Sequence, residues 1–256
     1  MLSLIEKVRS ARLGKTHLFS VGQAGFVVKS ASGQLLAIDL YLTDCVERLE
    51  GHAGFKRLLP KVLAPDDLVF DAVVCTHQHL DHFDTDAVPA MLANGHTRLL
   101  CSHDCEELIM QLGMDNFLEA ISFVAPGDSR SIGDFQLDFV NCDHGEAAPG
   151  AVGVIVTVDG KRIYETGDTR LRLDWLDEIL AFGHIDVLVA PINGRYGNMN
   201  EVDCSQLSGA LCPTITVPCH YGMFASHHGD VGLFYEIMLK MGLPALIMAQ
   251  GEQLTL

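Results

Sequence analysis

The chain has 256 residues, of which 48% are hydrophobic, so it is long and apolar enough to bury a sizeable core. It carries 17 basic and 33 acidic residues, a formal net charge of −16, which disfavours a long nucleic acid as a partner. No run approaches the length of a membrane span, about 18 continuous apolar residues, and the charged N-terminus does not resemble a signal peptide. We therefore expect a cytoplasmic protein without a membrane or nucleic-acid partner.

In the first half of the chain, short apolar runs alternate with turn signals. Glycine-containing turns separate the first three runs, which predicts an antiparallel meander. The fourth run is a buried strand that leads into a histidine-rich segment, and the acidic residues after that segment are typical of the first turn of a helix. The predicted strands are residues 17–22, 25–30, 34–40, 71–77 and 98–102, and the predicted helices are residues 84–94 and 103–113.

The second half of the chain repeats this alternation. Asp159 and Gly160 form a dipeptide that is typical of a β-hairpin turn. The predicted strands are residues 121–127, 135–144, 151–160, 161–169, 185–194, 214–220 and 245–254, and the predicted helices are residues 173–183, 202–211 and 231–242. No linker or change of composition interrupts the series. We therefore expect a single domain over residues 1–256, an α/β sandwich with its sheets inside and its helices outside.

Three histidines and two aspartates fall within residues 75–84, CTHQHLDHFD. His77 and His79 are two positions apart, so both imidazoles face the same side of an extended segment and can bind one ion. Asp81 and His82 follow a turn and can reach a second ion nearby. Imidazole and carboxylate ligands suit zinc, manganese or iron. The segment is therefore a candidate site for divalent metal ions.

Three later strands also end close to a side chain that can bind metal: His144, Asp168 and His220. A single histidine at a strand end is usually structural, but this set together with the HxHxDH cluster is far more specific. Strand ends belong to a rigid scaffold, so such side chains can meet at one edge of a sheet. We expect two metal ions that share a hydroxide, with Asp168 able to bridge them.

These residues resemble a known family. THQHLDH resembles the signature of the metallo-β-lactamase superfamily, and TGDT resembles its bridging-aspartate motif. The resemblance covers almost the whole chain and implies a four-layer αββα sandwich with the site at one edge of its two sheets. It also implies a first metal held by His77, His79 and His144, a second held by Asp81, His82 and His220, and Asp168 between them.

Three further stretches narrow the resemblance. VGQAGFVVKS, PINGRYGNMN and PCHYGMF are similar to the L-ascorbate-6-phosphate lactonase group. That group implies a manganese-dependent lactone hydrolase of the bacterial cytoplasm that assembles as a homo-oligomer. The chain is accordingly predicted to open a small lactone or ester, with an anionic sugar phosphate as the expected substrate class.

Four side chains are candidates for catalysis and substrate binding. Asp81 is expected to take part in catalysis, and Asn193 could donate a hydrogen bond to an oxyanion. Arg195 could bind a phosphate or carboxylate group, although an ordinary glycine-rich turn explains its segment equally well. His227 could line the substrate pocket, although a polar loop is the commoner explanation. Asp39 could orient a ligand histidine or could be an ordinary turn aspartate.

Two other functions fit the same ligands. Two metal ions also suit in-line displacement at phosphorus, so a small cyclic phosphodiester is an alternative substrate. A non-catalytic homologue that keeps the metals is the second alternative. Tight metal binding without turnover of any ester, lactone or phosphodiester would favour that last interpretation.

Overall fold

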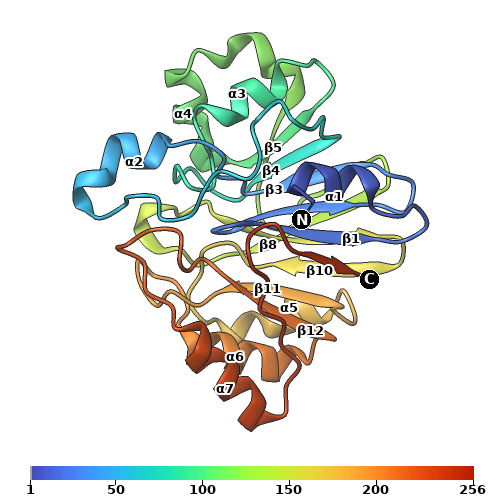
Figure 1. Ribbon diagram of the computed structural model, residues 1–256, viewed down its shortest axis with the longest axis vertical. Coiled ribbons are helices and arrows are strands. Elements are labelled where there is room, and N and C mark those ends of the chain that lie inside the picture. The colour runs from blue at the N-terminus through green and yellow to red at the C-terminus, as the bar shows by residue number, and fades with distance from the viewer. Residues whose placement is uncertain (1) are drawn as a thin grey trace.

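The computed structural model describes residues 2–256 and contains two mixed β-sheets that pack face to face between layers of helices (Figure 1). In the first sheet the chain begins with antiparallel neighbours and continues with parallel ones. Its strands, in spatial order, are β13 (Gln253–Thr255), β1 (His17–Gly22), β2 (Gly25–Lys29), β3 (Leu35–Ile38), β4 (Ala72–Cys75), β5 (Arg98–Ser102) and β6 (Ile121–Val124). The predicted meander at the start of the chain is confirmed.

The second sheet has the same mixed character. Its strands, in spatial order, are β12 (Ile215–Cys219), β11 (Val187–Pro191), β10 (Lys161–Glu165), β9 (Val152–Val158), β8 (Phe135–Asn141) and β7 (Ser129–Ile132). The pairs from β7 to β10 are antiparallel, whereas β10, β11 and β12 run parallel. Because parallel strands share their direction, the carboxyl ends of these last three strands meet at one edge of the sheet.

Helices cover the outer face of each sheet (Figure 1). The α-helices are α1 (Leu4–Ser10), α2 (Cys45–Glu50), α3 (Ala87–Leu92), α4 (Glu106–Gln111), α5 (Leu176–Leu180), α6 (Glu201–Leu211) and α7 (Val231–Met241), with 3-10 turns at Gly51–Ala53, His103–Cys105, Met114–Ala120, Gly145–Ala147 and Leu173–Trp175. Side chains of α1, α3 and α4 pack on the first sheet, and those of α5, α6 and α7 pack on the second. Among the described residues, no helix is both long enough and apolar enough to span a bilayer.

Alternation along the strands separates the core into layers. Val27 on β2 faces the helices, whereas its neighbours Phe26 and Val28 face the other sheet. This is the period of two that a strand buried on both faces imposes on its side chains. All these side chains are apolar, so each strand contributes to two cores at once.

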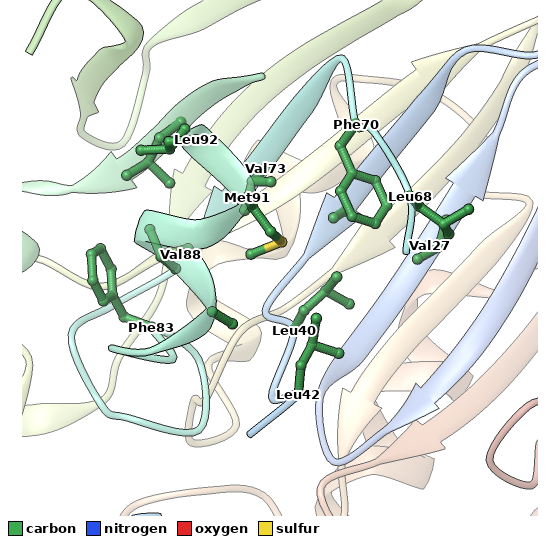
Figure 2. Close-up of a cluster of buried hydrophobic side chains, with 14 of the residues drawn as sticks. Val27, Leu40, Leu42, Leu68, Phe70, Val73, Phe83, Val88, Met91 and Leu92 are labelled. Carbon is green, nitrogen blue, oxygen red and sulfur yellow. The ribbon is translucent and has the colours of Figure 1, made fainter. Parts of the chain in front are cut away.

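The core under α3 holds the histidine-rich segment in place. In Figure 2, Val88 and Met91 of α3 lie close to Val73 of β4. Phe83 also belongs to this core and is fully buried. Since Cys75 at the end of β4 is likewise buried here, the histidine-rich loop is anchored in the core at both of its ends.

The four-layer αββα sandwich predicted from the sequence is confirmed, but some elements differ from the expectation. The strand predicted over residues 245–254 is wrong for most of its length, because only Gln253–Thr255 forms a strand. Leu246 and Met248 pack in the core between the sheets, while Ala245 and Ile247 pack in the core under α5, α6 and α7, so the apolar alternation is genuine. Apart from an isolated bridge between Thr216 and Ala245, this stretch pairs with no strand of the described residues. The helices α1 and α2 and the strand β7 were not predicted.

Candidate metal centre

The predicted ligands lie at the carboxyl ends of strands from both sheets. His77 follows β4 of the first sheet, whereas His144, Asp168 and His220 follow β8, β10 and β12 of the second. With His79, Asp81 and His82, they form two groups of ligand atoms, and a third group of His77, His82 and Asp168 overlaps both; the atoms of each group lie within 4.8 Å of one another. The structure therefore brings together side chains that are far apart in the sequence, as the strand-end pattern predicted.

The first group consists of three imidazoles. His79 Nδ1 lies 2.9 Å from His77 Nε2 and 3.0 Å from His144 Nε2. Burial lowers the pKa of all three rings, to about 4 for His144. The rings are therefore neutral at physiological pH, which is the form that binds metal.

The second group combines a carboxylate with two imidazoles. His220 Nε2 lies 3.3 Å from Asp81 Oδ2 and 3.3 Å from His82 Nε2, and the latter lies 3.8 Å from Asp81 Oδ2. His82 and His220 are buried. These three ligand atoms surround a second position beside the first group.

Asp168 lies between the two groups. Its Oδ1 is 3.5 Å from His82 Nε2, and its Oδ2 is 3.0 Å from His220 Nε2 and 3.9 Å from His144 Nε2. A carboxylate can bind a different ion through each oxygen, so Asp168 occupies the place expected of a bridging ligand.

Charge in the second group is balanced by protons when no cation is bound. Burial alone disfavours a charged imidazole, but Asp168 and Asp81 outweigh it and raise the pKa of His220 to about 9. The pKa of His82 is raised for the same reason, with Asp39 contributing. The pKa values of the two ligand carboxyls are lowered: burial opposes their ionisation, but the neighbouring imidazoles outweigh it.

The residues present fit divalent cations. In the first group, one nitrogen atom of each neutral ring points to a common centre: His77 Nε2, His79 Nδ1 and His144 Nε2. Hydrogen bonds among these three atoms cannot satisfy all of them. A cation at their centre would satisfy all three. In the second group, a cation would replace the imidazole protons as the partner of Asp81 and Asp168.

Asp39 supports the second group from behind. This fully buried carboxylate accepts hydrogen bonds from the Thr76 backbone N–H at 2.8 Å and from the Thr76 hydroxyl at 2.6 Å. Its Oδ2 also lies 2.7 Å from His82 Nδ1, which leaves Nε2 of that ring free for a metal. The structure therefore supports the prediction that Asp39 orients a histidine of the ligand set, and not the alternative of an ordinary turn aspartate.

The structure adds Gln23, which the sequence did not single out. This buried side chain lies in the turn between β1 and β2, and its Nε2 is 2.8 Å from Asp81 Oδ2 and 3.1 Å from His220 Nε2. The residue has a positive φ of 56°, unusual for a residue other than glycine. Such a backbone conformation cannot be read from one sequence, and only the stretch VGQAGFVVKS drew attention to this turn.

A cavity of about 510 Å³ opens beside the two groups, which contribute His79, Asp81, His144, Asp168 and His220 to its lining. The rest of the lining is mostly apolar, with Val46, Phe55, Leu80, Ala147 and Tyr196. Among the residues that the structure describes, Glu50 is the only charged side chain of the lining outside the ligand residues, and none of the lining side chains is a lysine or an arginine. Gln78 and His227 complete it.

The remaining predicted residues lie in different places. His227 lines the cavity, as expected. Asn193 and Arg195 are absent from the lining: Asn193 is buried and accepts a hydrogen bond from Asn198 at 3.1 Å, and Arg195 is exposed. The loop that carries them contributes Tyr196 to the cavity instead. Their catalytic and anion-binding roles stay predictions.

Comparison with known proteins places the chain in a family. Residues 17–220 match the family described as the beta-lactamase superfamily domain, so the chain belongs to the metallo-β-lactamase superfamily. A UPF0173 metal-dependent hydrolase of Anaeromyxobacter dehalogenans is 29% identical and is aligned over 86% of this chain and 79% of its own length. A second, from Carboxydothermus hydrogenoformans, is 25% identical over 92% of this chain and 98% of its own.

Solved structures show the same fold. Igni18, a metallo hydrolase from Ignicoccus hospitalis, has a TM-score of 0.75 at 23% identity and covers 94% of this chain and 98% of its own. An isothiocyanate hydrolase from Delia radicum gut bacteria has a TM-score of 0.69 at 22% identity and covers 93% and 98%. The superfamily expected from the sequence is thus confirmed, and the names of the relatives support a metal-dependent hydrolase. The lactonase group and the homo-oligomer stay predictions.

Proposed function

We propose that this chain is a hydrolase that uses two divalent cations to cleave a small lactone or ester with water. The observation that carries the proposal is the pair of ligand groups, joined by Asp168, beside a cavity of about 510 Å³. When bound, manganese, zinc or iron would supply an acidified water and would polarise the carbonyl oxygen. The metal-dependent hydrolases among the relatives agree with this chemistry.

The chain's own residues have separate roles in this proposal. His77, His79 and His144 would hold one cation, Asp81, His82 and His220 the other, and Asp168 would contact both. Asp81 also lines the cavity, where its carboxylate would accept a hydrogen bond from the attacking water and orient it. Most of these side chains are buried, so they are held in position before the substrate arrives.

The side chains that line the cavity indicate which class of substrate it can bind. Phe55, Leu80 and Tyr196 offer apolar surface, and no lysine or arginine of the lining offers a countercharge to a phosphate. This favours a lactone or ester whose non-reacting part is uncharged and apolar. The sequence led us to expect an anionic sugar phosphate held by Arg195, and the two possibilities predict opposite substrate preferences.

Proton release by the cation-loaded protein tests the proposal on two matched lactones, one with a short alkyl substituent and one with a phosphorylated sugar. We expect both rings to open and kcat/KM to rise about fourfold for each methylene that the cavity buries. A preference for the phosphorylated lactone would instead support the anionic substrate. Turnover of neither, with cations bound, would reject the lactone and ester assignment and favour a cyclic phosphodiester.

Two substitutions and one control distinguish the apolar wall of the cavity from the predicted anion site. Tyr196→Ala should reduce the preference for longer alkyl groups, whereas Tyr235→Ala, an exposed aromatic of α7 outside the cavity lining, should leave it unchanged. Arg195→Ala should not change KM for the alkyl lactone. A selective rise of KM for the phosphorylated lactone in Arg195→Ala would restore Arg195 as its anchor.

A further inference from the structure

Gln23 contacts both the second ligand group and the wall of the cavity. Its Nε2 lies 2.8 Å from Asp81 Oδ2 on one side and 3.1 Å from His227 Nδ1 on the other. The backbone carbonyl of Gln23 accepts a hydrogen bond from the His220 N–H at 2.9 Å, which fixes the turn against the site. This buried carboxamide is therefore placed to connect a ligand with a side chain that faces the substrate.

Asp81 determines which way the carboxamide points. An ionised carboxylate only accepts hydrogen bonds, so the group 2.8 Å away must be the amide nitrogen, which donates. An amide oxygen at that place would face another oxygen with no proton between them. With Nε2 so oriented, the amide has one further N–H to donate, and His220 Nε2 and His227 Nδ1 both lie 3.1 Å from it. His220 Nε2 belongs to the second ligand group, where its lone pair would bind the cation, so the N–H is left for His227 Nδ1.

The carboxamide in turn determines the tautomer of His227. An amide nitrogen cannot accept a hydrogen bond, so His227 Nδ1 must be the acceptor and the ring proton must be on Nε2. The ring is also held by stacking on His220, with centroids 4.6 Å apart, and by an edge-on contact with Phe55. Among the described residues, no side chain or backbone group forms a hydrogen bond with His227 Nε2.

We propose that Gln23 is a positioning residue, oriented by Asp81, that fixes His227 with its proton on Nε2 so that this N–H donates a hydrogen bond to a substrate oxygen. The inference rests on the proposed function for the identity of that oxygen, which belongs to the lactone or ester group. His227 would then be a catalytic residue, because it touches the reacting group beside the second cation. The sequence suggested His227 for the pocket, but gave no reason for its orientation.

The first test measures the tautomer itself. Nitrogen-15 NMR of the zinc-loaded protein distinguishes a protonated ring nitrogen from a bare one, and the His227→Phe variant identifies the signals of His227. We expect the proton on Nε2 in the wild-type chain. A wild-type His227 with its proton on Nδ1 would overturn the inference, whether or not the protein hydrolyses a lactone.

Two substitutions of Gln23 test its role. Asn tolerates the positive φ at this position but is one methylene shorter, so Gln23→Asn should lose the contact with His227 and the preference for one tautomer. Gln23→Glu puts a carboxyl group beside the Asp81 carboxylate, so the pair would share one proton. The Glu oxygen can then only accept a hydrogen bond from His227, which should move the ring proton to Nδ1. Retention of the wild-type tautomer in both variants would overturn the inference. Loss of a cation from Gln23→Asn, measured by metal analysis, would also overturn it, because Gln23 would then act through the cation site and not through His227.

Kinetics test the consequence for catalysis. His227→Phe should lower kcat about 100-fold, the effect of removing one oxyanion donor. Gln23→Glu, which moves the ring proton off Nε2, should lose a similar factor, whereas Gln23→Asn leaves part of the rings with a proton on Nε2 and should lose less. The double variant Gln23→Glu/His227→Phe should lose no more than His227→Phe alone. His228→Phe is the matched control, since His228 is the exposed neighbour outside the cavity lining, and its activity should be unchanged. If the losses of kcat in the two single variants add up in the double variant, Gln23 does not act through His227. A wild-type protein inactive on every lactone and ester would reject the proposed function, while the NMR result still decides the tautomer.

Discussion

Asp39 is outside both ligand groups, yet it touches the residues that set the geometry of the second one. Its carboxylate holds Thr76 through two hydrogen bonds and His82 through a third, and the residue has a positive φ of 47°. The carboxylate therefore both ties the end of β3 to the segment after β4 and orients the ring of His82. Partners of this kind commonly change metal affinity by about 10- to 100-fold when they are removed.

Asp39→Asn should weaken binding of the second cation by about 10- to 100-fold and leave the first cation nearly unaffected. The asparagine keeps the size of the side chain but removes the charge that favours the His82 ring in its ligand orientation. Isothermal titration of the metal-free variant measures the two affinities. Asp84→Asn is the control: Asp84 is equally buried but accepts hydrogen bonds from the backbone at Leu42 and Thr43, so it should lose stability and keep its cation affinities.

At the residue scale, the sequence predicted the convergence of the ligand side chains better than the substrate contacts. The convergence of His77 and Asp168 could be predicted because spacing and strand ends restrict where such side chains point. Arg195 was chosen for its chemistry alone, and the loop directs Tyr196 into the cavity in its place. The position of the Gln23 side chain depends on a left-handed backbone conformation in a hairpin turn, and no local pattern of residue types predicts that conformation.

Lys29 of β2 stabilises an element that the sequence did not predict. This buried lysine donates from Nζ to the backbone carbonyls of Val8 at 2.7 Å and Ala11 at 3.0 Å, at the C-terminal end of α1. Terminal carbonyls of a helix lack partners within the helix, so the ammonium group satisfies them and also complements the helix dipole. The first helix is thereby tied to the first sheet.

Lys29→Met should lower the free energy of unfolding by about 1–3 kcal/mol, because buried carbonyls lose their donor while the apolar stem is kept. Urea denaturation of the metal-free protein measures the change. Lys15→Met, at an exposed position, should have little effect. Equal stability of Lys29→Met and the wild-type chain would mean that α1 is held by the burial of Leu4 and Val8 alone.

At the scale of elements, the strands that lead to the site were predicted well because each is a short apolar run bounded by turns. The short helices α1 and α2 were not predicted. The first helix has seven residues and buries only Leu4 and Val8, which is too little periodicity to distinguish it from a loop. Residues 245–248 show the opposite error, since they have the alternation of a strand but pair with β12 only through the isolated bridge at Ala245.

Across the whole molecule, acidic residues outnumber basic ones by 33 to 17, and the candidate site is one place where acidic side chains are buried. In the second ligand group, Asp81 and Asp168 are balanced by protons on His82 and His220 when no cation is present. A cation can bind these imidazoles only after their protons leave. The first group has neutral rings and releases no protons near neutral pH.

The two cations should therefore differ in their dependence on pH. The pKa of His220 is raised to about 9, so this ring is protonated below that pH and the second cation should bind about tenfold more tightly per pH unit for each proton displaced, up to about pH 9. The first cation should bind with nearly constant affinity from about pH 7 upward, because burial lowers the pKa of its three histidines. Titration calorimetry in two buffers of different ionisation enthalpy measures the protons released. Two affinities that are equally independent of pH would contradict this account of the charge balance.

The most direct test is the number of divalent cations bound per chain at saturation, measured by elemental analysis after dialysis, together with lactone hydrolysis by the same samples. The wild-type chain should hold two cations, and His79→Ala and His220→Ala should each lose one cation and the activity, because the two residues belong to different ligand groups. A wild-type chain that saturates below two cations, or that hydrolyses the lactone unchanged after chelation, would contradict a two-cation hydrolase.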